Sequence, residues 1–180
     1  TTIINNNNYS VSGLATDGSY FFIANDKGDF QWSWGADEII MVNATTSNIV
    51  WVMDGPSNRD IEGLAYYNNI LYVAANGMNW QDSGYDWNNA GIFKIDVTDR
   101  EDWTNSSISS GFSSSDWFGA SDCTAPCSSG RAYVEDTWDQ IGGVAVDGSG
   151  SKLYATHKWG HRFYAGSLTD AKLNKVQTGG

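Results

Sequence analysis

Tryptophan is the residue type in this sequence whose placement most directly suggests a binding chemistry. Five of the nine indoles fall in three polar segments, Asp26 to Asp37, Asn76 to Ala90 and His157 to Arg162: they are Trp32, Trp34, Trp80, Trp87 and Trp159. A sugar ring presents apolar C–H faces and a rim of hydroxyl groups, so an indole platform flanked by amides and carboxylates supplies both halves of its recognition. The same indoles could instead pack these segments onto the fold or form a subunit interface, where tryptophan also concentrates.

Histidine and cysteine offer less. His157 and His161 could form a two-ligand zinc site or supply a general base, but neither has a recognisable carboxylate partner, which favours polar loop residues. Cys123 and Cys127 flank a proline turn, and in an oxidising compartment this spacing predicts a small disulfide loop. A zinc site there would need further Cys or His ligands, and no second pair lies nearby in the sequence.

Composition and charge restrict the partners. The formal net charge of -11 opposes binding to nucleic acid and to anionic membranes, and favours cations and neutral ligands. No apolar run approaches the roughly 18 residues of a membrane span. Only 17% of residues are charged, and a surface of Asn, Ser, Thr and Gly is more typical of extracellular, secreted proteins. Three sequons, at Asn8, Asn43 and Asn105, permit glycosylation, although about three would occur by chance.

A repeated pattern specifies the elements that must position these side chains. Gly-Leu-Ala-x-Asp-Gly or a close variant, followed by an aromatic-rich apolar run, begins at Gly13, Gly63 and Gly143. Each copy predicts a β-hairpin, and the copy at Gly63 turns at Asn68-Asn69. A third strand follows each hairpin, at Glu38–Asn43, Gly91–Asp96 and Arg162–Ser167. Predicted fourth strands include Asn48–Met53 and one near Leu173 to Gln177.

The repeat therefore covers a whole four-stranded unit. We expect an all-β chain with one partial domain, 1–180, divided into units at about 9–55, 59–110 and 139–180, with an insertion at 111–138. The segment Thr1 to Asn8 adds one short N-terminal strand with no partner beside it in the sequence. The Trp-bearing segments separate second from third strands, and long connections at equivalent edges of a repeat usually lie on one face and often carry function.

These units resemble the blades of six-bladed β-propellers, the group that includes gluconolactonase-like, NHL-type and phytase-like secreted proteins. The resemblance rests on Gly-Leu-Ala-x-Asp-Gly, on the second strand ending Ala24-Asn25, and on the third-strand pattern Ile92-Phe93-Lys94-Ile95-Asp96. It implies three four-stranded antiparallel blades. Propellers have about four to eight blades, so three cannot close a ring. The resemblance thus predicts either a homo-oligomer, in which copies of the chain complete the ring, or a larger propeller of which these residues are part.

Related propellers often hold a metal near their axis, and the resemblance implies the same here. The oxygen-bearing residues at the corresponding strand ends are suited to calcium, a hard cation: Asn25, Asp26, Asp60, Glu62 and Asn76. By position, Ser12, Glu62 and Gly142 align, as do Asn25, Ala75 and His157. Alternatively, Asp60 and Glu62 cap turns and face solvent.

Two functions compete. The first is an extracellular, non-enzymatic propeller module, structural or adhesive, that binds carbohydrate or assembles with a neighbouring subunit through its Trp-rich loops. The alternative is a calcium-dependent hydrolase of the lactonase or phosphoesterase kind, in which the metal would polarise the substrate and activate water.

Overall fold

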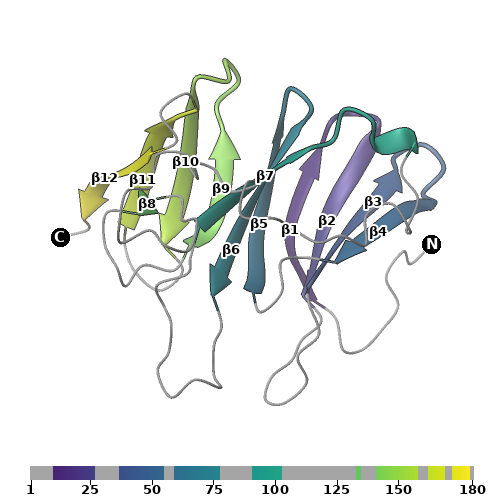
Figure 1. Ribbon diagram of the computed structural model, residues 1–180, viewed down its shortest axis with the longest axis horizontal. Helices are drawn as coiled ribbons and strands as arrows, with labels where there is room; N and C mark the ends of the chain where they lie inside the picture. Colours follow the sequence, from purple (N-terminus) through teal and green to yellow (C-terminus); the bar gives the residue numbers. More distant parts are fainter. Residues whose placement is uncertain are drawn as a thin grey trace, which may run out of the picture.

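The molecule consists of three β-sheets that stand side by side like the blades of a fan (Figure 1). The computed structural model describes residues 10–26, 37–54, 59–77, 91–102, 133–134, 141–157, 162–168 and 172–178. Within these residues the structure is β, apart from one short 3-10 helix, η2 (Arg100–Asp102). The described part of the chain contains no helix of the length and hydropathy needed to cross a bilayer.

The first sheet is a simple antiparallel meander. It has the order β1-β2-β3-β4, formed by β1 (Ser10–Thr16), β2 (Tyr20–Asp26), β3 (Glu38–Asn43) and β4 (Ile49–Asp54). Asp17 closes its first turn by accepting the backbone N–H groups of Ser19 and Tyr20, both at 2.7 Å. Such Asx turns are the reason that Asp is favoured at hairpin turns.

The second sheet has the order β5-β6-β7, with β5 (Arg59–Tyr67), β6 (Ile70–Gly77) and β7 (Gly91–Asp96). Asn68 and Asn69 have φ angles of 48° and 62° at its first turn. Positive φ at both central residues is the type I′ geometry that suits the twist of a two-residue hairpin, and asparagine tolerates it. The predicted Asn68-Asn69 hairpin is therefore confirmed.

The third sheet has five described strands in the order β8-β12-β11-β10-β9. They are β8 (Tyr133–Val134), β9 (Ile141–Val146), β10 (Lys152–His157), β11 (Arg162–Ser167) and β12 (Lys172–Thr178). The two-residue β8 comes from the segment expected to be an insertion, and it pairs parallel to the outer strand β12.

The predicted fold class, a β-propeller-like stack of three antiparallel blades, is confirmed. The strand numbers differ in two places, because β8 extends the third sheet and the second sheet has three strands among the described residues. A fourth strand of the second unit would lie in 103–110, and the predicted N-terminal strand lies in 1–8; both ranges are outside the described residues.

Two hydrophobic clusters fill the spaces between neighbouring sheets. The first lies between the first and second sheets, and its largest fully buried members are Phe22, Trp51 and Phe93. The second lies between the second and third sheets and includes Tyr72, Ile92 and Tyr164. The sheets therefore cohere by burying apolar faces against each other, as stacked layers must.

The first strands of the three units come closest to one another, and glycine makes this approach possible. A Cβ atom on Gly13 would lie 2.8 Å from the Cα of Gly63, and one on Gly63 would lie 3.0 Å from the Cα of Gly143. Real Cβ atoms essentially never come closer than 3.0 Å to another atom, and a contact of 3.0 Å is tighter than nine in ten real ones. The first glycine of the repeated pattern is thus fixed by sheet-to-sheet contact.

Polar bonds add to this contact between the first two sheets. The Arg100 guanidinium forms an ion pair of 2.5 Å with the Asp17 carboxylate, whose side chain is only 3% exposed. The Trp51 indole N–H donates to the Arg100 carbonyl at 3.1 Å. Arg100, in η2 after the second sheet, thereby ties together a turn and an edge strand of the first sheet.

Candidate functional site

The three hairpins all open toward the same end of the molecule. Strands β1, β5 and β9 begin, and β2, β6 and β10 end, at the lower edge of the sheets in Figure 1, which we call the lower end. The connections from β2 to β3, from β6 to β7 and from β10 to β11 leave the sheets there. These connections contain the five predicted indoles, all of which lie outside the described residues, so the predicted Trp platform remains a prediction.

Each first strand carries a β-bulge close to the lower end. The register shifts at Ser12, at Glu62 and near Gly142, the three positions that the sequence pattern aligns. The residue before each bulge pairs with the last part of the second strand: Val11 with Asn25, Ile61 with Ala75 and Ile141 with His157. Bulges recur beside functional sites because they redirect side chains, and here the same device occurs in each unit.

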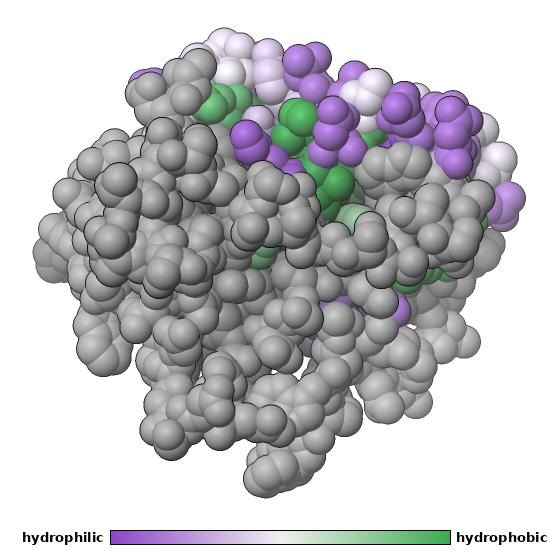
Figure 2. Space-filling model, in the orientation of Figure 1, coloured by the Kyte–Doolittle hydropathy of each residue, from purple (hydrophilic) through white to green (hydrophobic). Residues whose placement is uncertain are grey.

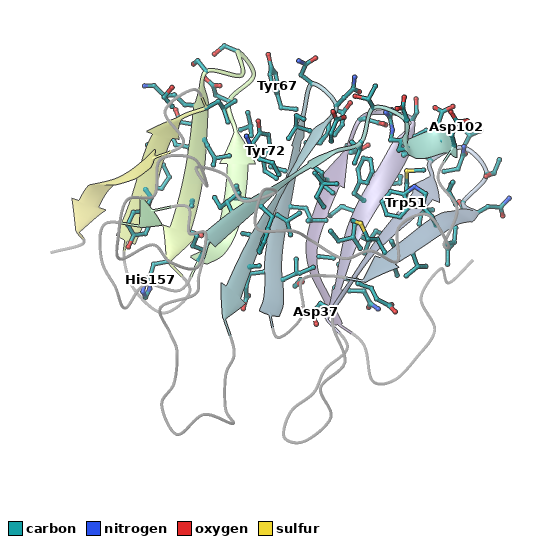
Figure 3. All side chains as sticks on the ribbon, in the orientation of Figure 1. Asp37, Trp51, Tyr67, Tyr72, Asp102 and His157 are labelled. Carbon is teal, nitrogen blue, oxygen red and sulfur yellow. The ribbon has the colours of Figure 1, made fainter. Side chains whose placement is uncertain are left out.

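The second bulge is bonded to the first sheet through Ile61. Its backbone N–H donates to the Asp37 carboxylate at 2.6 Å, and its carbonyl accepts from the Ser12 hydroxyl at 2.5 Å. Asp37 is 6% exposed and precedes β3, at the lower end in Figure 3. Sequence reasoning missed Asp37 and the bond from Ser12; the one available signal was an acidic residue directly before a buried apolar strand in the first unit.

Among the described residues, Asn25 is the most deeply buried polar side chain near this end. It is 1% exposed, and its amide nitrogen donates to the Glu38 carboxylate at 3.3 Å. Its carbonyl oxygen is buried and accepts no hydrogen bond within the described structure. Because a buried acceptor without a hydrogen bond costs about 1–3 kcal/mol, a ligand or a water molecule that donates to this oxygen would be stabilised there.

The predicted calcium ligands lie on strands of the first and second sheets. Asn25 and Glu62 lie at bulge-associated positions of adjacent sheets, while Asp60 pairs in register with Asn76, and Asp26 ends β2. The side chains of Asp26, Asp60 and Asn76 are outside the described residues. Among the described side chains, no group of three or more His, Cys, Asp or Glu residues could hold a metal ion. The predicted calcium site therefore stays a prediction.

Other predicted sites fall partly outside the described chain. Cys123, Cys127, Asn8, Asn105 and His161 lie outside it, so the disulfide and two of the sequons stay predictions. Asn43 is described, and its side-chain oxygen accepts the N–H groups of Thr45 and Thr46 at 3.0 and 2.8 Å. This sequon therefore begins a hydrogen-bonded turn. His157 is partly exposed at the lower end (Figure 3).

The best-defined electrostatic feature lies at the opposite, upper end. Asp147, in the turn from β9 to β10, accepts the N–H groups of Lys152 and Ser151 and the hydroxyl groups of Ser149 and Ser151. The bond from the Lys152 N–H, followed by the others, lowers the pKa of the Asp147 carboxyl to about 2. Figure 2 shows hydrophilic residues gathered along this upper rim.

Comparison with known proteins finds distant structural likenesses only. No family model matches the sequence, and no curated protein is significantly similar to it. The structure is similar to the computationally designed Ika4 protein, at 11% identity and a TM-score of 0.49, over 98% of this chain and 78% of that one. It is also similar to the Cps50 (Swd1) β-propeller domain of Myceliophteria thermophila, at 11% identity and a TM-score of 0.45, over 96% of this chain and 42% of that one.

A third similar structure is a Bacteroides uniformis protein provisionally described as a 6-phosphogluconolactonase. The identity is 12% and the TM-score 0.37, over 92% of this chain and 55% of that one. The chain thus spans about half the length of the two natural proteins. At such identities and TM-scores, these likenesses say nothing about what this chain binds or catalyses.

Proposed function

We propose that this protein is an extracellular, non-enzymatic propeller module that binds a neutral glycan at its lower end. The observation that carries the proposal is the common direction of the three hairpins. The strand ends that flank the β2–β3, β6–β7 and β10–β11 connections share one end of the sheets (Figure 1). The described strand ends on either side of the five indoles therefore lie at one end of the sheets, although the first and last of these indoles are more than a hundred residues apart in the sequence.

The chemistry of these connections supports a glycan as the ligand. An indole offers a flat apolar surface for the C–H face of a sugar, and neighbouring Asn, Gln and Asp side chains offer partners for its hydroxyl groups. A net charge of -11 leaves a neutral ligand without electrostatic penalty and opposes an anionic one.

The bonds at the lower end support a scaffold for this platform. Asp37 and Ser12 both bond to the backbone of Ile61 across two sheets, so these polar groups hold the strand ends in place. A rigid framework under variable connections is the common arrangement of binding loops.

A second candidate is favoured by one specific observation. The Asn25 carbonyl oxygen is buried without a hydrogen bond, next to Glu38, at the end where the resemblance to gluconolactonase-like propellers implies a calcium ion. In this alternative, Asn25 and Glu62, together with Asp26, Asp60 and Asn76, would hold the ion for a lactonase- or phosphoesterase-like hydrolysis. Calcium would supply Lewis-acid polarisation of the substrate.

In the decisive experiment, the wild-type protein is first screened against an array of neutral oligosaccharides. The affinities of wild type and variants for the best oligosaccharide found are then measured by titration calorimetry. Trp80→Ala is expected to weaken binding at least about tenfold, as truncation of a central aromatic contact does. Trp117→Ala is the matched control, because it removes an indole outside the three connections. Equal affinity of wild type and Trp80→Ala, or no binding to any oligosaccharide, would reject the proposal.

The same samples separate the two candidates. Calcium titration and assays with lactone and phosphoester substrates are run on wild type and Glu62→Gln. Calcium-dependent turnover that the substitution abolishes would replace the glycan proposal with the hydrolase.

A further inference from the structure

Every sheet of this molecule has two faces, and equivalent positions of the repeat lie on the same face in each unit. We call the face toward the next unit in the chain the front face and the face toward the preceding unit the back face. Strand register defines the equivalent positions: Ala15 pairs with Phe22, Ala65 with Tyr72 and Ala145 with Tyr154. The three units can therefore be compared position by position.

The front faces of the first and second sheets are covered. In the first sheet the front positions are buried in the cluster shared with the second sheet: Ala15, Phe22, Ala24 and Ile39. In the second sheet the equivalent positions are buried in the cluster shared with the third: Ala65, Tyr72, Ala74 and Ile92. Small residues on the first strand and an aromatic ring on the second characterise this face.

The back faces of the second and third sheets are also covered. In the second sheet the back positions belong to the first cluster: Leu64, Leu71, Val73 and Phe93. In the third sheet the equivalent positions belong to the second cluster: Val144, Leu153, Ala155 and Tyr164. Each covered interface thus joins a front face of small and aromatic residues to a back face rich in aliphatic residues.

Among the described residues, one face of each kind has no other sheet packed against it. The back face of the first sheet carries Leu14, Phe21, Ile23 and Ile40 at the positions equivalent to the covered back faces. Ile40 is buried, but Leu14 is 59% exposed and Phe21 is 37% exposed, whereas their equivalents Leu64 and Leu71 are 6% and 0% exposed. The front face of the third sheet presents Ala145, Tyr154, Thr156 and Phe163, with the rings of Tyr154 and Phe163 stacked at 5.6 Å. Phe163 is 37% exposed, and its equivalent Ile92 is fully buried.

Gly143 gives the most specific indication that another sheet packs on this front face. The backbone of the next sheet leaves no room for a side chain at Gly13 and little room at Gly63. Among the described residues, a Cβ atom on Gly143 would meet the flexible Thr156 hydroxyl, at a tight 3.3 Å, and no backbone within 4 Å. No backbone of the described residues accounts for a glycine here, whereas a further first strand packed on this face would.

From these observations we propose that two copies of this chain join head to tail into a closed ring of six sheets. The front face of the third sheet of each copy packs on the back face of the first sheet of the other, so that Gly143 meets Gly13 of the second copy. Both uncovered faces are then covered by the partners that the repeat provides for their equivalents. Two copies give six blades, within the range of known propellers, whereas three would give nine.

The ring interface uses the sheet faces and not the lower end, so it is independent of the glycan site. It also differs from assembly through the Trp-rich connections, which the sequence suggested. Exposed apolar patches of this kind on a folded domain commonly mark protein interfaces.

Sedimentation velocity over a concentration series tests the ring with two pairs of variants. Gly143→Ala places a methyl group where the partner's backbone would lie, and Leu14→Glu would bury a charge in the new interface. Gly148→Ala and Thr45→Glu are the matched controls, since Gly148 has no atom within 4 Å of an added Cβ and Thr45 is an exposed turn residue. All variants are first checked for wild-type melting behaviour, and Leu14→Ser replaces Leu14→Glu if the latter fails to fold.

The ring predicts a wild-type species of two chains. Gly143→Ala is expected to raise its dissociation constant about tenfold or more and Leu14→Glu about a hundredfold or more, with both controls unchanged. Dissociation by Leu14→Glu alone would indicate a back-to-back dimer and overturn the head-to-tail ring. A wild-type chain that stays single at micromolar concentration, or an assembly of another size, would overturn the proposal as well.

Discussion

Gly13→Ala should be one of the most damaging single-methyl additions in this protein. The new Cβ would lie 2.8 Å from the Cα of Gly63, 2.9 Å from the backbone nitrogen of Leu64 and 3.1 Å from the Gly63 carbonyl carbon. Favourable contacts between such atoms begin at about 3.5 Å, so the first and second sheets must separate locally by about half an ångström or more. All three neighbours are backbone atoms, so no side chain can rotate away.

The cost follows from the packing that this separation disturbs. Overpacking a close-packed interior costs about 1–3 kcal/mol, and the absence of a flexible neighbour places Gly13→Ala near the upper limit, at about 2–3 kcal/mol. In urea denaturation, with a slope of about 2–3 kcal/mol per molar, this lowers the midpoint by about 1 M. Gly148→Ala, where an added Cβ has no neighbour within 4 Å, should leave the midpoint unchanged. A Gly13→Ala midpoint equal to that of Gly148→Ala would refute the close approach of the first strands.

Two further predictions concern the upper end of the sheets. Arg100→Ala leaves the Asp17 carboxylate, which is 3% exposed, without its ion-pair partner. It should lower the free energy of unfolding by about 3 kcal/mol in the same urea assay. A change below about 0.5 kcal/mol would contradict the structural role of this pair. The Asp147 carboxyl, whose pKa is lowered to about 2 by its turn hydrogen bonds, should stabilise the fold above the unfolded-state pKa of about 4 and lose this effect as the pH falls toward 2. A carboxyl titration by NMR with a midpoint near 4 would show that these bonds do not form.

The sequence predicted the strands well because the determining interactions are local. Asn68 and Asn69 specify a tight turn, Asp17 and Asp147 cap the equivalent turns, and alternating apolar residues define faces. The position-by-position alignment of the repeats also located Ser12, Glu62 and Gly142, each of which lies at or beside a bulge.

Contacts between sheets were beyond such reasoning. The bond from Ile61 to Asp37 joins residues 24 positions apart, and the Trp51 bond to Arg100 joins residues 49 positions apart. Neither has a sequence signature, since a buried carboxylate before a strand resembles an ordinary polar cap. The same holds for Gly13 and Gly63, which the pattern marked as repeated glycines without indicating that backbone packs against them.

The parallel pairing of β8 with β12 was missed for a similar reason. Two residues, Tyr133 and Val134, carry too short a pattern to predict a strand, and their partner lies about forty positions further along the chain. They pair there because the outer strand β12 would otherwise be an open edge of the third sheet, which is visible only in the folded structure.

Native mass spectrometry of the wild-type chain tests the central structural claim most directly, because the uncovered faces of the first and third sheets require each other. We expect a dominant species of twice the 19.7 kDa chain mass at low micromolar concentration. A single 19.7 kDa species throughout the concentration series would contradict it.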